Sequence, residues 1–353
     1  MLDLDRQETY NRMDPSGLGE RIAGLPGQCK QAWEQASGLD LPAEYSKVSH
    51  IVVIGMGGSA IGGDLLAGLV EFENAPPVQV IRGYQLPSWV GSDTLVIASS
   101  YSGNTEETLS AYREASLRGA RLVAMTSGGI LAKEAAANET PLFRIGYKGE
   151  PRSAVGYSFL GPLAILCNLR LIKDATLPLK NALEQLQEFS ETLDPEIAQE
   201  KNLAKRLASA NFGRFPVVYG AGFLTAVARR WKTQLNENGK VWASYEPLPE
   251  VHHNAVLGYS KPTELSGRMH VTLLHSDLIH PRVSLRYQIT REILSRDGVD
   301  YMQVDGVGGT PLAHLLSTVL LGDFVSYYLG ILNGMDPVQA TTIEELKKRL
   351  AEG

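Results

Sequence analysis

The chain has 353 residues, 44% of them hydrophobic and 20% charged, with a net charge of −6. This length suits two α/β domains of roughly 150 residues each. An acidic chain without a basic stripe excludes nucleic acid as an expected partner. We find no run of about 18 apolar residues and no signal-like start, so we expect a cytoplasmic protein that does not bind membranes. Cys29 and Cys167 match no metal or redox spacing and are expected to be buried free thiols.

Residues 1–46 are expected to form a helical arm. Strands and helices then alternate over residues 47–172, which predicts a doubly wound parallel sheet of the flavodoxin type. The strands expected in this domain are 50–54, 78–81, 94–98, 121–125 and 141–145. Its expected helices are 61–70, 105–116, 130–137 and 154–172.

Residues 173–212 read as a helical, charged connector, and a second α/β domain follows over residues 213–353. Its expected strands are 215–219, 270–274 and 301–304, and its expected helices are 224–236, 284–297, 311–332 and 343–350. A faint internal repeat supports two domains of one architecture, because residues 52–57 parallel residues 217–222. The first copy continues with small residues and the second with Phe223. This asymmetry indicates that the ligand is anchored in the first half.

Two turns of the first half carry the chemistry of anion binding. Gly55 to Ala60 follows a strand and opens a helix, and the amides at a helix N-terminus favour an anion. A dinucleotide-binding turn looks much the same. Arg82 stands where an acidic residue would meet the ribose of a dinucleotide, although a phosphorylated dinucleotide could use that arginine. This turn alone therefore leaves both ligand classes open.

The second turn, Ser100 to Thr105, ends the next strand and begins another helix. Its hydroxyl and backbone N–H groups can all donate to phosphate oxygens. The alternative is a simple helix cap, in which Thr105 acts with Glu107 or Thr108. Three hydroxyls are more than a cap needs, so we favour a phosphate cradle. The expected phosphate-binding residues are Gly57, Gly58, Ser59, Ser100, Ser102 and Thr105.

Both turns resemble the SIS (sugar isomerase) phosphosugar-binding domain, and nearly the whole chain resembles the bifunctional phosphoglucose/phosphomannose isomerases. The further segments that carry this resemblance are Pro151-Arg152, 235–238, His253-Asn254, 323–328, Asp336-Pro337 and 343–347. The resemblance implies two SIS domains. It also implies interconversion of glucose 6-phosphate and mannose 6-phosphate with fructose 6-phosphate through a cis-enediol, without an organic cofactor.

Such an isomerase needs an acid to open the sugar ring, a base to move a proton, and a cation to stabilise the enediolate. The resemblance assigns the base to Glu237 and ring opening to His253. It places Arg152 and Lys347 near the enediolate. His252 stands where the family usually has asparagine and is the alternative to His253, and Lys348 is the alternative to Lys347.

The resemblance also implies a homodimer with shared active sites, because this histidine comes from the neighbouring subunit in related isomerases. No third ligand is spaced for zinc beside His252 and His253, so we expect no metal. Three alternatives to this isomerase remain. They are a non-catalytic SIS protein that senses sugar phosphates, a SIS enzyme for another sugar phosphate and, more distantly, a dinucleotide oxidoreductase.

Overall fold

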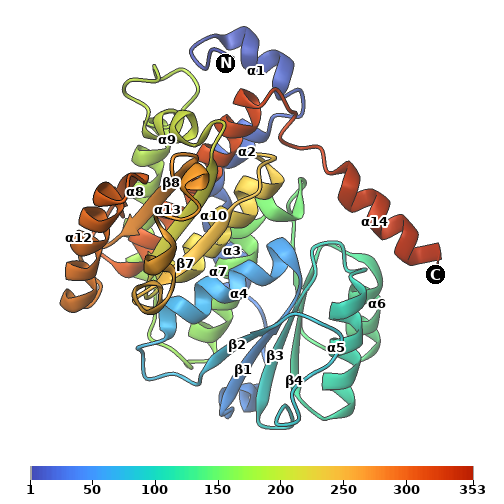
Figure 1. Ribbon diagram of the computed structural model, residues 1–353. Coiled ribbons are helices and arrows are strands. Elements are labelled where there is room, and N and C mark those ends of the chain that lie inside the picture. Colours follow the sequence, from blue (N-terminus) through green and yellow to red (C-terminus); the bar gives the residue numbers. More distant parts are fainter. Residues whose placement is uncertain (1, 353) are drawn as a thin grey trace.

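Two parallel β-sheets, each covered by helices, make up the structure (Figure 1). The computed structural model describes residues 2–352. The segment before the first sheet is helical, as expected. Its elements are α1 (Gln7–Met13), α2 (Leu18–Ala23), α3 (Leu25–Ser37) and the 3-10 helix η1 (Ala43–Ser46). Helix α3 packs against α7 (Val155–Asn168), so this N-terminal arm belongs to the folded core.

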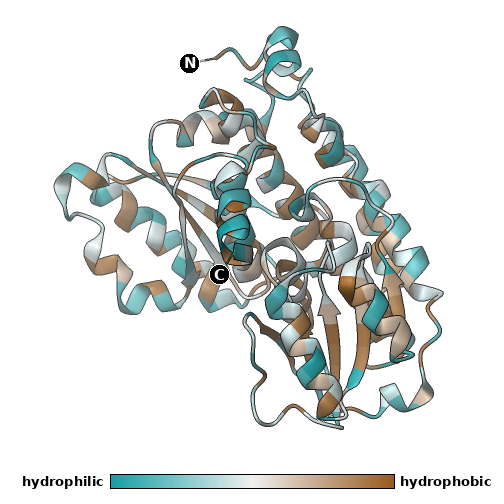
Figure 2. Ribbon diagram, turned by 90° about the vertical axis from the view of Figure 1, so that its right-hand side faces the viewer, coloured by the Kyte–Doolittle hydropathy of each residue, from teal (hydrophilic) through white to brown (hydrophobic). Residues whose placement is uncertain are grey.

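The first sheet has five parallel strands in the order β2-β1-β3-β4-β5. These strands are β1 (His50–Ile54), β2 (Val78–Ile81), β3 (Thr94–Ser99), β4 (Arg121–Thr126) and β5 (Leu142–Arg144). Besides α7, its helices are α4 (Gly57–Val70), α5 (Glu106–Leu117), α6 (Gly129–Ala137) and the 3-10 helix η2 (Pro151–Ser153). The order is that of flavodoxin-like sheets and confirms the predicted doubly wound fold. In Figure 2 its apolar strands lie between helices that turn polar residues outward.

The second sheet has four parallel strands in the order β7-β6-β8-β9. They are β6 (Phe215–Ala221), β7 (Ser244–Leu248), β8 (Met269–His275) and β9 (Asp300–Asp305). The helices of this half are α10 (Leu224–Glu237), α11 (Thr263–Ser266), α12 (Pro281–Arg296), α13 (Pro311–Leu332), α14 (Thr341–Glu352), η3 (Glu250–His253) and η4 (Ala255–Gly258). Strand β7 was not among the expected strands. Its Pro247 is tolerated because β7 is an edge strand, where a missing N–H breaks no central ladder.

The segment between the two sheets forms α8 (Thr176–Glu191) and α9 (Leu203–Asn211). Both helices pack against α13. Leu179, Leu186 and Leu207 are buried there, so the charged residues of this segment cover only its outer face. Helix α13 is long and apolar enough to cross a membrane by composition, but it lies fully buried at the centre of the protein, where a core helix lies.

Helices α4 and α10 are the first helices after the leading strands of the two sheets, and they pack against each other. Near the end of α4, a Cβ added at Gly68 would lie 3.3 Å from the Cα of Phe223, just before α10. Midway along, Asp64 of α4 pairs with Arg229 of α10 at 3.3 Å. The two helices therefore run antiparallel, and the N-terminal end of α4 meets the C-terminal end of α10.

The two cysteines differ in burial. Cys29 is buried in the core as expected, and burial raises the pKa of its thiol to about 12. Cys167 is only partly buried, so the expectation was wrong for this residue. It lies in the last turn of α7, where the chain leaves the core.

Candidate active site

The turn after β1 is shaped to approach a neighbouring backbone closely. Gly57 begins α4 with a φ of +49°, a conformation that favours glycine. A Cβ at Gly58 would lie 2.8 Å from both Arg152 Cα and the carbonyl oxygen of Pro151. Only glycine at position 58 therefore lets η2 rest against the start of α4, beside the amides of the helix N-terminus.

The two predicted phosphate-binding turns contact each other. The buried Ser59 hydroxyl accepts a hydrogen bond from the backbone N–H of Tyr101 at 3.1 Å. Ser100 donates to the Thr105 hydroxyl at 2.9 Å and accepts from the Gly103 N–H at 3.1 Å. Thr105 is thus bonded to Ser100 rather than to the first amides of α5, which is not the pattern of the simple helix cap. The structure brings all six predicted phosphate-binding residues to the carboxyl ends of β1 and β3.

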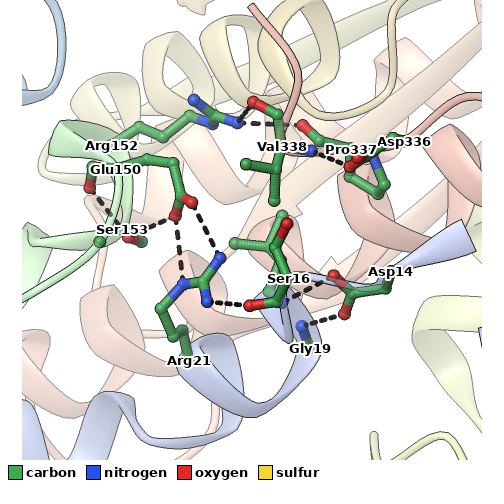
Figure 3. A network of polar contacts seen from close by, with 12 residues as sticks. Asp14, Ser16, Gly19, Arg21, Glu150, Arg152, Ser153, Asp336, Pro337 and Val338 are labelled. Carbon is green, nitrogen blue, oxygen red and sulfur yellow. Dashed lines mark hydrogen bonds and ion pairs between the residues drawn. The ribbon is translucent and has the colours of Figure 1, made fainter. Parts of the chain in front are cut away.

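Arg152 is buried, with 5% of its surface exposed, and its guanidinium is held on several sides. Its Nε donates to Asn238 Oδ1 at 2.6 Å. Its Nη2 donates to the carbonyl oxygens of Pro337 and Val338 at 2.9 and 3.1 Å (Figure 3). The remaining nitrogen, Nη1, lies 3.7 Å from Glu237 Oε2. A fixed cation therefore faces the predicted base.

Glu237 is the last residue of α10, and the antiparallel packing of α4 and α10 places it near the predicted phosphate-binding turns. Its side chain keeps 29% of its surface exposed. Lys240 donates through Nζ to the carbonyl oxygens of Glu237 at 2.6 Å and Pro337 at 3.2 Å, and also to that of Gln339. Burial, followed by the nearby Arg152 cation, lowers the pKa of Lys240.

Sequence reasoning assigned no role to Lys240, which joins α10 to the segment around Pro337. The signal available in the sequence was its place in the polar run 234–240. A positive φ of 55° at Lys240 shows that the chain turns sharply there.

His253 and Lys347 lie apart from this cluster within one chain. His253 is exposed on η3, directly after β7. Lys347 is exposed on α14, which extends away from the body of the protein (Figure 1). The structure therefore brings together the two predicted phosphate-binding turns, Arg152 and Glu237, and leaves the other two predicted catalytic side chains on the surface.

His252, the alternative to His253, is engaged with helix α12. Its Nδ1 lies 3.1 Å from Arg286 Nη1 and its Nε2 lies 2.8 Å from Thr290 Oγ1. Because a guanidinium only donates, Nδ1 must accept and Nε2 must carry the proton. Burial, then Arg286 and His253, lower the pKa of His252. His252 is thus held as a neutral ring, while His253 is exposed.

The structure also bears on a metal ion and on a dinucleotide as ligands. Within residues 2–352, no group of three His, Cys, Asp or Glu side chains is placed to hold a metal ion. Arg82 is paired with Asp64 through two contacts of 2.5 and 3.2 Å, so its guanidinium is already engaged. A cleft of about 880 Å³ lies between the two halves, and its lining includes Asp64, Arg82, Phe223 and Arg229. Its lining residues, all within the described part of the chain, include none of the predicted catalytic or phosphate-binding residues.

Comparison with known proteins agrees with this arrangement. Residues 44–145 match the SIS domain, and residues 200–350 match the bacterial phospho-glucose isomerase C-terminal SIS domain. A bifunctional phosphoglucose/phosphomannose isomerase of Caldicellulosiruptor bescii is 37% identical over 334 residues, which cover 94% of this chain and 98% of that protein. A protein of the same name from Aquifex aeolicus is 38% identical over 312 residues, covering 88% and 93%.

Solved structures show the same fold. A hypothetical protein from Thermus thermophilus superposes with a TM-score of 0.76 at 18% identity, covering 98% of this chain and 93% of that one. The sequence relatives exceed 30% identity over most of the chain, and both halves match SIS families. The chain therefore belongs to the family of bifunctional phosphoglucose/phosphomannose isomerases.

Proposed function

We propose that this protein interconverts glucose 6-phosphate and mannose 6-phosphate with fructose 6-phosphate. The observation that carries the proposal is the 3.7 Å approach of Arg152 Nη1 to Glu237 Oε2, beside two phosphate-binding turns. A carboxylate, a buried cation and an anion cradle are what proton transfer on a phosphorylated sugar requires. Neither a metal ion nor an organic cofactor is needed for these steps.

The phosphate group anchors the substrate at the start of α4 and at the Ser100–Thr105 turn. The protein carries a net charge of −6, so the attraction must come from local groups and not from the overall field. Backbone amides at the start of α4 and the hydroxyls of the two turns supply it. The sugar chain then extends toward Glu237 and Arg152.

Glu237 acts as the base in this proposal. It removes the proton from C2 of the open-chain aldose and delivers it to C1, while the hydroxyl proton of O2 passes to O1. The aldose thereby becomes the ketose through a cis-enediolate. The charge that develops on the enediolate oxygens is stabilised by Arg152, whose guanidinium is already oriented by Asn238 and the Pro337 carbonyl. Glucose 6-phosphate and mannose 6-phosphate differ only at C2, so rotation about C2–C3 presents either epimer to the same base.

Ring opening is assigned to His253 of a second subunit. His253 is exposed on η3 and lies apart from Glu237 within one chain, as a side chain shared across a dimer would. A shared site is easily tested with two inactive variants, Glu237→Gln and His253→Ala. Co-expression should restore about a quarter of the wild-type activity, because half of the dimers are mixed and one of their two sites is intact. No restoration would place both groups in the same subunit.

The first experiment is proton NMR of fructose 6-phosphate with the protein in D₂O and EDTA. Glucose 6-phosphate and mannose 6-phosphate should both form with deuterium at C2. Only one epimer would limit the activity to one aldose. If the substrate stays unchanged but still binds, the protein senses sugar phosphates and is not an isomerase. Profiling other sugar phosphates separates a different SIS isomerase from both.

A further inference from the structure

One carboxylate is buried at the centre of the long apolar helix α13. Asp323 is the only Asp, Glu, Lys or Arg residue within 311–332, and 4% of its surface is exposed. An unpaired carboxylate at such a place would strongly destabilise the fold. Its partners therefore decide what it does.

Two residues of α10, one turn apart, pair with this carboxylate. Arg230 Nη2 donates to both oxygens of Asp323, at 2.8 and 2.6 Å, and Gln234 Nε2 donates at 2.9 Å. Arg230 is 1% exposed. Burial raises the pKa of the Asp323 carboxyl, whereas Arg230 and Gln234 favour its charged form. The pair is an ion pair enclosed in the core.

Two chains of hydrogen bonds run from Asp323 to Arg152. In the first, Arg230 Nη2 also donates to the main-chain carbonyl of Arg152 at 3.1 Å. In the second, the Ser326 hydroxyl donates to the main-chain carbonyl of Asp323 at 2.8 Å and accepts from Asn238 Nδ2 at 3.1 Å. Asn238 Oδ1 in turn accepts from Arg152 Nε. The chain from the Asp323 side chain holds the backbone of Arg152, and the chain from the Asp323 main-chain carbonyl holds its guanidinium.

We propose that Asp323 and Arg230 are positioning residues that set Arg152 for the reaction by holding its main chain. This inference rests on the proposed function, in which Arg152 stabilises the enediolate. A buried ion pair is often no more stabilising than apolar residues of the same volume. Its geometry, in contrast, determines where Arg152 lies, and a catalytic cation must be held within about 0.5 Å of its working position.

Two substitutions test the proposal at different strengths. Asp323→Asn keeps the shape of the side chain and removes its charge, so kcat should fall about 10- to 100-fold while KM for fructose 6-phosphate changes less than about 3-fold. Ser326→Ala cuts only the hydrogen-bond chain through Asn238 and is a small change in the core. Its kcat should fall about 3- to 10-fold.

A control separates positioning from the loss of a charge pair elsewhere in the chain, in which the Lys205 ammonium is buried and the Asp5 side chain is 45% exposed. Asp5→Asn removes the carboxylate that lies 3.0 Å from the buried ammonium of Lys205, in the N-terminal arm. This variant should lose thermal stability without a change in kcat. If Asp323→Asn behaves in the same way as Asp5→Asn, the inference is wrong.

A double-mutant cycle shows whether Asp323 acts through Arg152. In an Arg152→Gln background, Asp323→Asn should cause no further loss of kcat, because the residue that it positions is already absent. Equal fractional losses in both backgrounds would overturn the inference. The melting temperatures of the four proteins show whether any variant is unfolded.

A readout without activity separates this inference from the proposed function. The Nε–H NMR signal of Arg152, identified by its loss in Arg152→Gln, reports its bond to Asn238. The signal should shift or broaden in Asp323→Asn and in Ser326→Ala, and stay in place in Asp5→Asn. An unchanged signal in the first two variants overturns the positioning role. Absence of isomerisation by the wild-type protein would overturn only the proposed function.

Discussion

Gly57 and Gly222 stand at equivalent positions of the two halves, each in the turn after the leading strand of its sheet. Their φ angles, +49° and +53°, are nearly the same. The next residue differs, because Gly58 follows in the first half and Phe223 in the second. Gly58 leaves room for the backbone of Arg152, whereas Phe223 places a ring against the core. The same turn thus forms the predicted anion cradle in one half and packs against the core in the other.

The helices that follow these turns contribute opposite ends to the predicted site. The N-terminal end of helix α4 belongs to the proposed phosphate site, and the C-terminal end of α10 carries Glu237, the proposed base. Their antiparallel packing brings these opposite ends together. Two domains of one fold can therefore form one asymmetric site, provided that the equivalent helices of the two domains contribute opposite ends.

The largest expected effect comes from the α10 end of this arrangement. Glu237→Gln removes the base but keeps the shape, so kcat should fall about 1,000-fold or more. Sugar-phosphate binding should persist, because the two phosphate-binding turns are unchanged. NMR in D₂O and a binding titration measure the two properties separately. Glu292→Gln, on α12, is the control and should keep full activity. Near-normal turnover by Glu237→Gln would show that another group is the base.

A substitution at each turn tests the contrast between the halves directly. Gly58→Ala places a Cβ 2.8 Å from backbone atoms of η2, which must move and take Arg152 with them. We expect kcat to fall about 10- to 100-fold. Gly222→Ala has nothing nearer than Ile279 Cγ2 at 3.9 Å, so it should cost only the backbone strain of about 1 kcal/mol and leave kcat unchanged. Equal losses of activity would mean that the two turns do not differ in function.

The fold could largely be predicted because alternating strands and helices leave a strong local pattern. The first sheet illustrates this, since its strands lie where the apolar runs predicted them. Strand β7 could not be recognised from the sequence, because Pro247 and the following Pro249 are atypical of a strand, and Pro247 is tolerated here only at the edge of the sheet. Helices α8 and α9 read as a charged connector, and only their contacts with α13 show that Leu179 and Leu186 face the core.

The site was harder to predict because it depends on contacts between distant segments. The bond from Arg152 to Asn238 spans 86 positions, and the bond to Pro337 spans 185. No local sequence pattern predicts such contacts, so no role was assigned to Lys240 or Asp323 from the sequence. The roles of all the predicted site residues remain predictions, and His253 and Lys347 in addition lie on the surface of a single chain, apart from the other predicted residues.

The two neighbouring lysines of α14 offer a smaller test, outside both turns. Lys347→Ala should lower kcat about 10-fold, because it removes one of two cations assigned to the enediolate. Lys348→Ala is the matched control, since both side chains are exposed on the same helix. We expect it to keep full activity. The reverse result would transfer the role to Lys348, and no effect from either would leave Arg152 as the sole cation.

The smallest expected effect concerns His252 and the pH dependence of stability. In the folded protein its Nδ1 accepts from Arg286, so protonation would set two cations against each other. The pKa of His252 is therefore lowered in the folded state. Below about pH 6.5, His252 binds a proton in the unfolded chain more readily than in the folded chain. The free energy of unfolding therefore decreases as the pH is lowered from about 6.5 towards the lower pKa of the folded state.

Asparagine, which the resemblance led us to expect at this position, cannot titrate and gives the comparison that isolates this effect. The free energy of unfolding of the wild-type protein should fall relative to that of His252→Asn between pH 7 and pH 5. The change should stay below about 1 kcal/mol, because the ring is partly exposed and screened by solvent. Urea unfolding at a fixed protein concentration measures it. Parallel pH curves for the two proteins would mean that Arg286 and burial do not hold His252 in its neutral form.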